Sequence, residues 1–420
     1  MHGHGQISAP SMPVRRQSGG ATLRRAAAAA GLRHAAAAAM TLVLAAGLAS
    51  PARAWHTIAE GEKGKLEVEG RLMFWGVSSG REVFGAAQDE EVRDFFVRRA
   101  RLLIQGKPSD KLTVYFQLGQ DNINQKIPTI AGSTRLPTED TGFKFKDAYL
   151  NYKVREGFQV TAGMFKIPFL RSSLMSGFNQ LLVDRALLPS LRPAREGSRD
   201  LGGMVWGNAG GFQYRTAIFD GSDQEDSNTG SSFRGSARVA YNWFTRETGP
   251  GYTGTSIGEK KILQIGAQVD AQNDRLDSRD DTTALAAKLR DYRSWAADVF
   301  YDQPIAGGHS AFTFEGAWLD RRDDYTDPTE PERRIDGFYA QAGFLLPGKV
   351  GSGRLQLAAR WEELDSERGT VETETSRRTA GITWYGKGHD RKIQFDYTDR
   401  REEPVDLSDD EFRLSLLVAF

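Results

Sequence analysis

Apolar and polar residues alternate with a period of two along most of this chain. The clearest run is Lys111–Asp121, in which Leu112, Val114, Phe116 and Leu118 fall on one face and the residues between them on the other. Side chains that alternate in this way point to opposite sides of a β-strand. Sixteen such runs can be marked, so the pattern predicts an all-β protein.

The sixteen expected strands are Lys65–Val77, Asp94–Gln105, Lys111–Asp121, Lys144–Val154, Phe158–Phe165, Leu201–Trp206, Phe212–Asp220, Phe233–Trp243, Lys261–Asp270, Trp295–Asp302, Ala311–Asp320, Gly337–Leu346, Arg354–Asp365, Thr375–Tyr385, Lys392–Arg400 and Glu411–Phe420. A short helix is expected at Thr283–Arg290 in one polar loop. Short turns alternate with long connections, which is the wiring of outer-membrane barrels. The pattern therefore predicts a 16-stranded antiparallel transmembrane β-barrel.

Two soluble folds compete with this interpretation. A β-sandwich and a lipocalin-like barrel also alternate, but neither explains the regular change between short and long connections. Several predicted strand ends carry aromatic residues, among them Trp75, Trp206, Trp243, Tyr385 and Phe420. Aromatic side chains favour the interface between membrane and water. The final run would expose an apolar edge in a soluble protein, whereas in a barrel it pairs with the first strand and faces lipid.

The N-terminus reads as a targeting segment. Arginines precede the apolar run Ala35–Ala49, and Ala52-Arg53-Ala54 fits a cleavage site between small residues. We expect residues 1–54 to be a signal peptide and residues 55–420 to form the barrel domain. Removing residues 1–54 takes away six arginines and leaves 49 basic and 55 acidic residues, a net charge of −6. A net negative charge argues against nucleic-acid binding.

Composition narrows the choice of function further. The chain has no cysteine, and its mean hydropathy of −0.49 suits a barrel in which every second residue faces a wet lumen. Outside the extreme N-terminus there is no apolar run long enough for a membrane-spanning helix. Three scattered histidines remain in the expected mature chain, and no nucleophile motif is present. We therefore expect no catalytic residues, no metal site and no cofactor.

The candidate chemistry lies in the long connection Lys166–Asp200, which has six basic and three acidic residues, a net charge of +3. Its arginines are expected to line a constriction: Arg171, Arg185, Arg192, Arg195 and Arg199. Arginine offers a fixed fork of donors to anionic oxygens. By strand phase, the lumen wall should add Arg99, Arg101, Lys153, Arg215, Arg234, Arg238 and Arg377, with Arg360, Lys392 and Arg413 as further wall positions. Arg98 falls on the opposite phase and is expected near the lipid headgroups.

Each of these arginines has an alternative structural role, since Asp184 and Asp200 could simply pair with their neighbours and brace the loop. The connection Asp320–Asp336 carries four basic and seven acidic residues, a net charge of −3. The expected pore therefore has an acidic mouth and a basic constriction.

Several motifs are similar to those of the phosphate-selective porin O and P family: DFFVRRARLLIQG, FKDAYLNY, GMFKIPFLRSSLMSG, DRALL and REGSRDLG. The resemblance extends from about Leu66 to Phe420. It implies a homotrimer of sixteen-stranded barrels with an inward-folded third loop, and Lys166–Asp200 is the third long loop in this chain. It also implies the bacterial outer membrane as location, membrane lipid and inorganic anions as partners, and phosphate or polyphosphate among the solutes.

Two other functions stay open at this point. The net charge of −6 would suit a general or weakly cation-preferring diffusion porin. A barrel whose lumen is plugged would serve as a structural protein or adhesin.

Overall fold

The computed structural model describes residues 55–62, 64–79, 92–125, 142–191, 198–221, 232–277, 288–325, 331–404 and 407–420, which belong to the unit Ser50–Phe420. The expected signal peptide, residues 1–54, lies outside these ranges. In the described part of the chain, no helix combines the length and the apolar character needed to cross a membrane.

The strands follow one another as β1 (His56–Gly61), β2 (Gly64–Ser79), β3 (Val92–Ser109), β4 (Leu112–Ile123), β5 (Lys144–Arg155), β6 (Phe158–Lys166), β7 (Arg199–Ala209), β8 (Phe212–Phe219), β9 (Arg234–Asn242), β10 (Ile262–Asp277), β11 (Lys288–Ile305), β12 (Ser310–Tyr325), β13 (Arg333–Leu345), β14 (Arg354–Arg368), β15 (Val371–Lys387), β16 (Arg391–Glu403) and β17 (Leu407–Ala419). Helical structure in these ranges is limited to α2 (Arg171–Leu174) and the 3-10 turns η1 (Leu188–Ser190) and η2 (Ala306–Gly308). The prediction of a helix at Thr283–Arg290 is wrong at its C-terminal end, because residues 288–290 belong to β11 and pair with β10. Residues 283–287 lie outside the described ranges.

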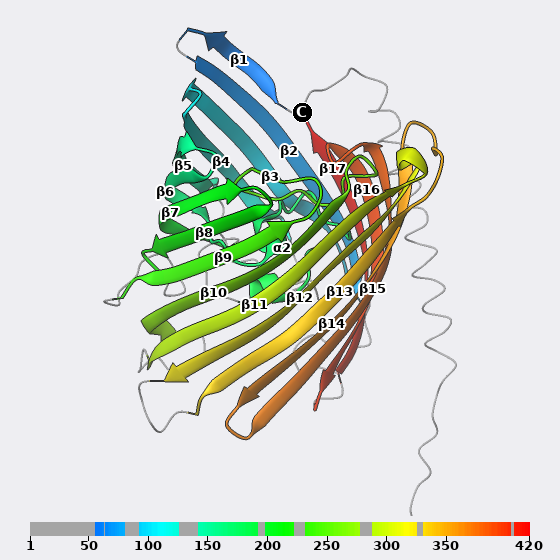
Figure 1. Cartoon of the computed structure of the whole chain (residues 1–420). Helices are drawn as coiled ribbons and strands as arrows, with labels where there is room; N and C mark the ends of the chain where they lie inside the picture. The colour runs from blue at the N-terminus through cyan, green and yellow to red at the C-terminus, as the bar shows by residue number, and fades with distance from the viewer. Residues whose placement is uncertain are drawn as a thin grey trace, which may run out of the picture. The chain divides into compact units, whose positions relative to one another are not determined.

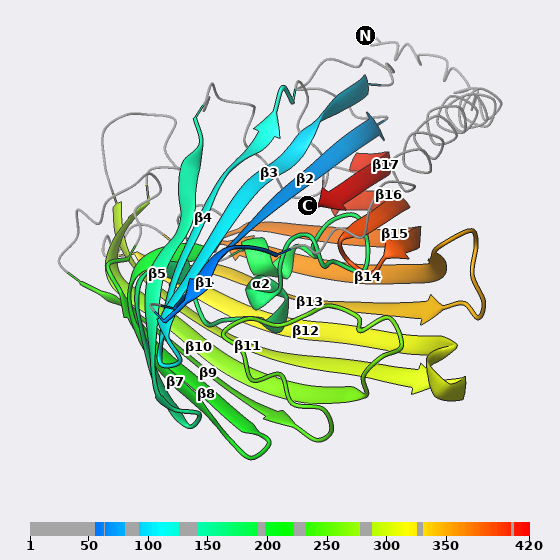
Figure 2. The same ribbon diagram turned by 90° about the horizontal axis from the view of Figure 1, so that it is seen from above.

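Each strand from β2 to β17 pairs antiparallel with the next, and β17 pairs with β2 from Glu411↔Ser79 to Ala419↔Arg71. These strands close a ring, which confirms the sixteen-stranded antiparallel barrel (Figure 1, Figure 2). The additional strand β1 was not predicted. It pairs with residues 64–68 of β2, beyond the stretch of β2 that β17 covers.

The ring of strands has an apolar outer face and a polar inner face, whereas a soluble protein has a polar surface and an apolar core. Along β9, Arg234, Ser236 and Arg238 are buried, whereas Val239 and Tyr241 are exposed. The same division runs through β11 and β14, whose exposed face carries Trp295 and Trp361 while the buried face carries charged and amide side chains. An apolar outer face and a polar inner face are what a barrel in a lipid bilayer requires.

Some aromatic residues expected at the membrane interface lie inside instead. Trp75 and Trp206 are almost completely buried on the inner face, and Tyr385 is buried as well. Trp243 and Phe420 are about half exposed, as expected for interface positions. The sequence locates these aromatic residues, but it does not distinguish those at the membrane interface from those packed inside the barrel, because an inner apolar patch also needs large side chains.

The connections divide the ring into a turn end and a loop end. The turn end carries the two-residue turns 110–111, 156–157 and 210–211. The expected regular alternation fails at several connections, most clearly at two. The β9–β10 connection at the turn end is long, residues 243–261, and the β14–β15 connection at the loop end is only residues 369–370. The β6–β7 connection, residues 167–198, is the third at the loop end.

Candidate functional site

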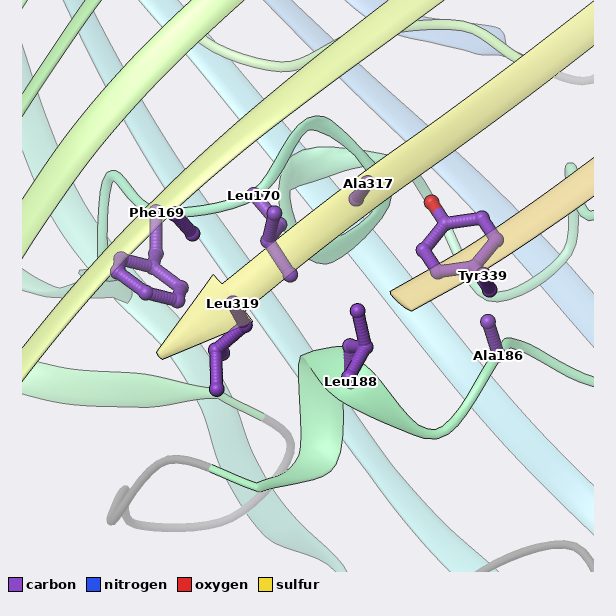
Figure 3. Close-up of a cluster of buried hydrophobic side chains, with 8 residues drawn as sticks. Phe169, Leu170, Ala186, Leu188, Ala317, Leu319 and Tyr339 are labelled. Carbon is purple, nitrogen blue, oxygen red and sulfur yellow. The ribbon is translucent and has the colours of Figure 1, made fainter. Parts of the chain in front are cut away.

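Residues 167–191, here named the loop segment, contact inward-facing side chains over a wide arc of the ring. Figure 3 shows Phe169, Leu170, Ala186 and Leu188 of this segment packed with Ala317, Leu319 and Tyr339 of β12 and β13. The β14 and β16 strands hold its backbone. The amide of Leu187 donates to Glu362 at 2.6 Å, and the amide of Val183 donates to Asp396 at 3.0 Å.

The loop segment also reaches the next strands around the ring, β17, β2 and β3. Phe178 and Val183 form one buried cluster with Met73, Trp75 and Val77 of β2, Phe96 of β3 and Leu417 of β17. Gly177 comes so close to β3 that a Cβ atom there would lie 3.1 Å from Cζ of Arg99. The segment is therefore fixed at both sides, and Figure 2 shows α2 within the ring of strands.

A second segment, residues 243–261, approaches the loop segment from the turn end; we name it the turn segment. Arg171 of α2 is completely buried and joins the two segments. Its Nη1 lies 2.6 Å from a carboxylate oxygen of Glu247, and its Nη2 donates to the carbonyl of Thr253 at 3.0 Å. The guanidinium also stacks over the rings of Phe300 and Tyr252, 3.9 and 4.5 Å from their centroids.

Tyr252 is the centre of the turn segment's contacts. Its hydroxyl accepts from Nη1 of Arg215 at 2.6 Å and donates to Gln213 at 2.6 Å. Nε of Arg238 approaches the same oxygen at 3.3 Å. Burial would raise the pKa of Tyr252, but Arg215 and Arg238 more than offset this, so the pKa lies below its usual value.

Most of the arginines predicted to line the pore are neutralised by a carboxylate. Besides Arg171, the ion pairs are Arg199–Asp147, Arg101–Asp121, Arg234–Asp270 and Arg238–Asp298. Arg199 makes a fork to Asp147 at 2.9 and 2.8 Å, and Arg238 makes one to Asp298 at 2.5 and 2.8 Å. An ion pair of this kind presents little net charge to a passing solute, so the paired arginines brace the interior.

The other predicted positions differ in their surroundings. Arg185 donates to the carbonyl of Met175 at 2.8 Å and has no carboxylate within ion-pair distance in the described residues. Arg99 has only a loose pair with Asp184, at 3.6 Å. Two inward arginines, Arg215 and Arg377, also lack a carboxylate partner within the described ranges, although Arg215 donates to Tyr252, Gln213 and two backbone carbonyls. Lys153 is exposed near the turn end, and Arg192 and Arg195 lie outside the described residues.

Two basic residues point inward because of β-bulges, and strand phase alone did not predict this. The β2–β3 register shifts between Met73 and Phe74, so that Arg98 is an extra residue of β3. Its guanidinium stacks over Trp75 at 4.7 Å and lies 4.0 Å from Asp184, which corrects the headgroup position expected for it. A second shift places Lys146 of β5 inside, 3.5 Å from Asp121. Bulges re-aim side chains in this way near functional sites.

These side chains form what we name the basic cluster, which joins β3, β4 and β5 to the loop segment and the adjoining ends of β6 and β7. Its seven basic members are Arg98, Arg99, Arg101, Lys146, Lys166, Arg185 and Arg199, and its three acidic members are Asp121, Asp147 and Asp184, giving a net charge of +4. Lys166 and Arg185 meet at the carbonyl of Met175, to which both donate.

Several members of the basic cluster remain reachable by solvent from inside the ring. The side chains of Arg98, Arg99 and Asp121 are 15, 11 and 30 % exposed. Burial would raise the pKa of Asp184, but the charges of Arg98 and Arg99 more than offset it, so the pKa lies below its usual value. Asp184 therefore stays ionised and cancels only part of the surrounding positive charge.

A second charged group, on β14–β17, has four basic and five acidic side chains, a net charge of −1. Its basic side chains are Arg360, Arg377, Arg400 and Arg413, and the acids paired with three of them are Glu362, Glu402, Asp409, Asp396 and Glu411. This group therefore gives no local excess of positive charge. The excess lies in the basic cluster, on β3–β7 and the loop segment.

The model of one protein family, phosphate-selective porin O and P, matches residues 76–414. The chain belongs to this family. It is an outer-membrane porin of bacteria, and its family and fold are those of a channel rather than of an enzyme. In the described residues, no group of His, Asp and Glu side chains is arranged to hold a metal ion.

Similar proteins are distant in sequence. An uncharacterized protein of Aquifex aeolicus (strain VF5) is 28% identical over 326 residues, which cover 72% of this porin and 74% of the relative. The anion-selective porin from Comamonas acidovorans has a TM-score of 0.55 at 12% identity, covering 84% of this chain and 99% of that one. OmpT of Vibrio cholerae, in its trimer form, gives 0.55 at 8% identity, with 85% and 99% covered. At these identities the structures bear on the fold alone.

Proposed function

We propose that this porin conducts anions in preference to cations, with phosphate among its solutes, and that the basic cluster is the site of selection. The observation that carries the proposal is the net charge of +4 among buried and half-buried side chains on the inner face, of which Arg98, Arg99 and Asp121 are partly exposed. Charge lining a narrow, low-dielectric passage raises the local concentration of the opposite ion. The membership in the phosphate-selective family and the name of the Comamonas acidovorans porin support the same direction.

We further propose that the loop segment is the inward-folded third loop expected from the sequence. Its fixed contacts with β12–β14 on one side and β2, β3 and β17 on the other support this role. The passage then runs beside β3–β5, where Arg98, Arg99 and Arg185 have the weakest carboxylate pairing. Arg171, Arg234 and Arg238 lie behind the segment as braces.

The test is the reversal potential in planar bilayers under a gradient of potassium chloride. Arg99→Gln or Arg185→Gln removes one charge from the cluster. A unit charge about 7 Å from a permeating ion in a water-like dielectric contributes about 0.6 kcal/mol, with opposite sign for an anion and a cation, so the ratio of anion to cation permeability should fall roughly sevenfold. Arg378→Gln is the matched control, because Arg378 has the same charge but lies on the exposed outer face of β15.

Cation preference of the unmodified porin would overturn the proposal, and so would equal effects of the inner and outer variants. Phosphate added to chloride solution should reduce the chloride current by competing for the cluster. If phosphate has no such effect, the general diffusion porin is the better description.

We also propose a homotrimer and a cleaved signal peptide. The trimer form of the Vibrio cholerae relative supports the first, and the basic-then-apolar N-terminus supports the second. Analytical ultracentrifugation in detergent should give three chains per particle. Sequencing of the exported protein should begin at Trp55, and a mature chain that retains residues 1–54 would refute the cleavage.

A further inference from the structure

Two tyrosines on the inner face differ from the other tyrosines inside the ring. Tyr115 of β4 and Tyr149 of β5 are direct cross-strand partners, with ring centroids 5.2 Å apart and planes tilted by 31°. Both are only half buried. Within the described residues, the hydroxyl of Tyr149 makes no hydrogen bond, so it is available as a donor.

In four buried tyrosines inside the barrel, by contrast, the hydroxyl donates to another side chain. Tyr292 donates to Asp270, Tyr339 to Glu315, Tyr385 to Gln356 and Tyr252 to Gln213. These hydroxyls serve the internal packing, since a buried hydroxyl needs a partner. The Tyr149 hydroxyl has no such partner among the described residues. The side chains of Tyr115 and Tyr149 are partly exposed to solvent inside the barrel.

The aromatic surface continues behind the pair. The ring of Tyr149 meets Phe165 of β6 edge-on at 6.3 Å, and Phe165 lies 5.1 Å from Phe219 of β8. Phe165 and Phe219 are buried in one apolar cluster together with Met204 and Trp206. The pair is thus the accessible edge of a rigid aromatic patch, and its rings lose little freedom when a flat solute stacks on them.

The basic cluster begins two residues away. Toward the loop end, the next inward pair is Gln117 and Asp147, and Asp147 is held by Arg199. Two residues along a strand span about 7 Å, so a carboxylate on a ring stacked over the tyrosines points into the space between the pair and the Asp147–Arg199 ion pair. A ring lying on the tyrosines would place its carboxylate beside the positive charge of the cluster.

We propose that Tyr115 and Tyr149 form a stacking subsite for an organic anion with a flat apolar ring, an aryl carboxylate. The ring contacts the tyrosine pair, the hydroxyl of Tyr149 donates to the solute, and the carboxylate lies toward Arg199, the member of the basic cluster held at Asp147 beside the pair. This inference rests on the proposed anion preference and adds a substrate class to it. Stacking and charge together favour such a solute over a small anion with the same charge.

The test compares benzoate with acetate as blockers of the chloride current through the purified porin in planar bilayers. The two have the same charge, and only benzoate has a ring. Benzoate should reduce the current by half at a concentration at least about threefold lower than acetate does. Tyr149→Leu should bring the two concentrations together and leave the reversal potential in potassium chloride unchanged. Tyr149→Phe, which keeps the ring, should retain most of the difference.

Tyr152→Leu is the matched control, because Tyr152 lies on the exposed outer face of the same strand. Equal block by benzoate and acetate in the unmodified porin would overturn the subsite while leaving anion preference intact. Cation preference in the reversal potential would instead overturn the proposed function. Folding of each variant is checked by its heat-modifiable migration on a denaturing gel, and the comparison in the unmodified porin stands whether or not a variant folds.

Discussion

The contact between the loop segment and the turn segment includes one buried ion pair, between Arg171 and Glu247. In Glu247→Gln, the completely buried guanidinium of Arg171 keeps neutral partners such as Gln264 and the carbonyl of Thr253, but loses the charge 2.6 Å away. Removing one partner of a buried ion pair costs about 3–5 kcal/mol. The Glu247 side chain is 11% exposed, so the lower value applies. About 3 kcal/mol corresponds to a roughly 100-fold larger population in which the two segments separate.

Separation of the segments should appear in single-channel recordings as frequent transitions to a higher conductance, because the loop segment loses its support at the turn end. Amide hydrogen exchange near α2 should accelerate by a similar factor. Glu259→Gln is the control, since Glu259 is an exposed acid on the same segment. The double variant Arg171→Met/Glu247→Gln should show nearly as few transitions as the unmodified porin, because it removes both charges. Transitions as frequent in the double variant as in Glu247→Gln would refute the reasoning.

Three further predictions concern the barrel itself, and the temperature at which heat-modifiable migration is lost measures each of them. Gly207→Ala should lower this temperature, since a Cβ atom at this position would lie 2.2 Å from the carbonyl oxygen of Gly157; an unchanged value would contradict the close approach. Val239→Arg places a charge on the apolar outer face and should lower stability by up to the roughly 2–4 kcal/mol that a cation costs at the bilayer midplane, whereas no loss would contradict the lipid-facing assignment. Burial, together with the charge of Lys392, lowers the pKa of His389 to about 3. Below about pH 6.5 the unfolded chain therefore binds a proton at this residue that the folded chain does not, and stability should fall from pH 6.5 to pH 3. The fall should be less steep in His389→Gln.

The sequence predicts the strands of this porin well because the signal is local. A strand between lipid and a polar interior must alternate, and the alternation is visible in any run of about ten residues. The pairing of charges is not local. Arg238 meets Asp298 and Arg171 meets Glu247 because strands and segments far apart in sequence come together, so the sequence alone did not separate paired from unpaired arginines.

Phase arguments also fail where a bulge shifts the register. Arg98 and Lys146 turn inward at such shifts, and neither shift has a marker in the sequence that strand periodicity can detect. The turn segment was missed for a different reason. Its length of about nineteen residues, at an end where the other turns have two to eight, was a visible signal, but length alone does not tell where a segment folds.

The place of the basic cluster along the pore axis has an electrical consequence. Lys166 ends β6 and Arg199 begins β7, so the cluster lies toward the loop end of the ring. Fixed charge placed away from the middle of a pore makes the two directions of current unequal, because ions accumulate more readily when driven from the charged side. The porin should therefore rectify, and the sign of the rectification reports which way each molecule is inserted in a bilayer.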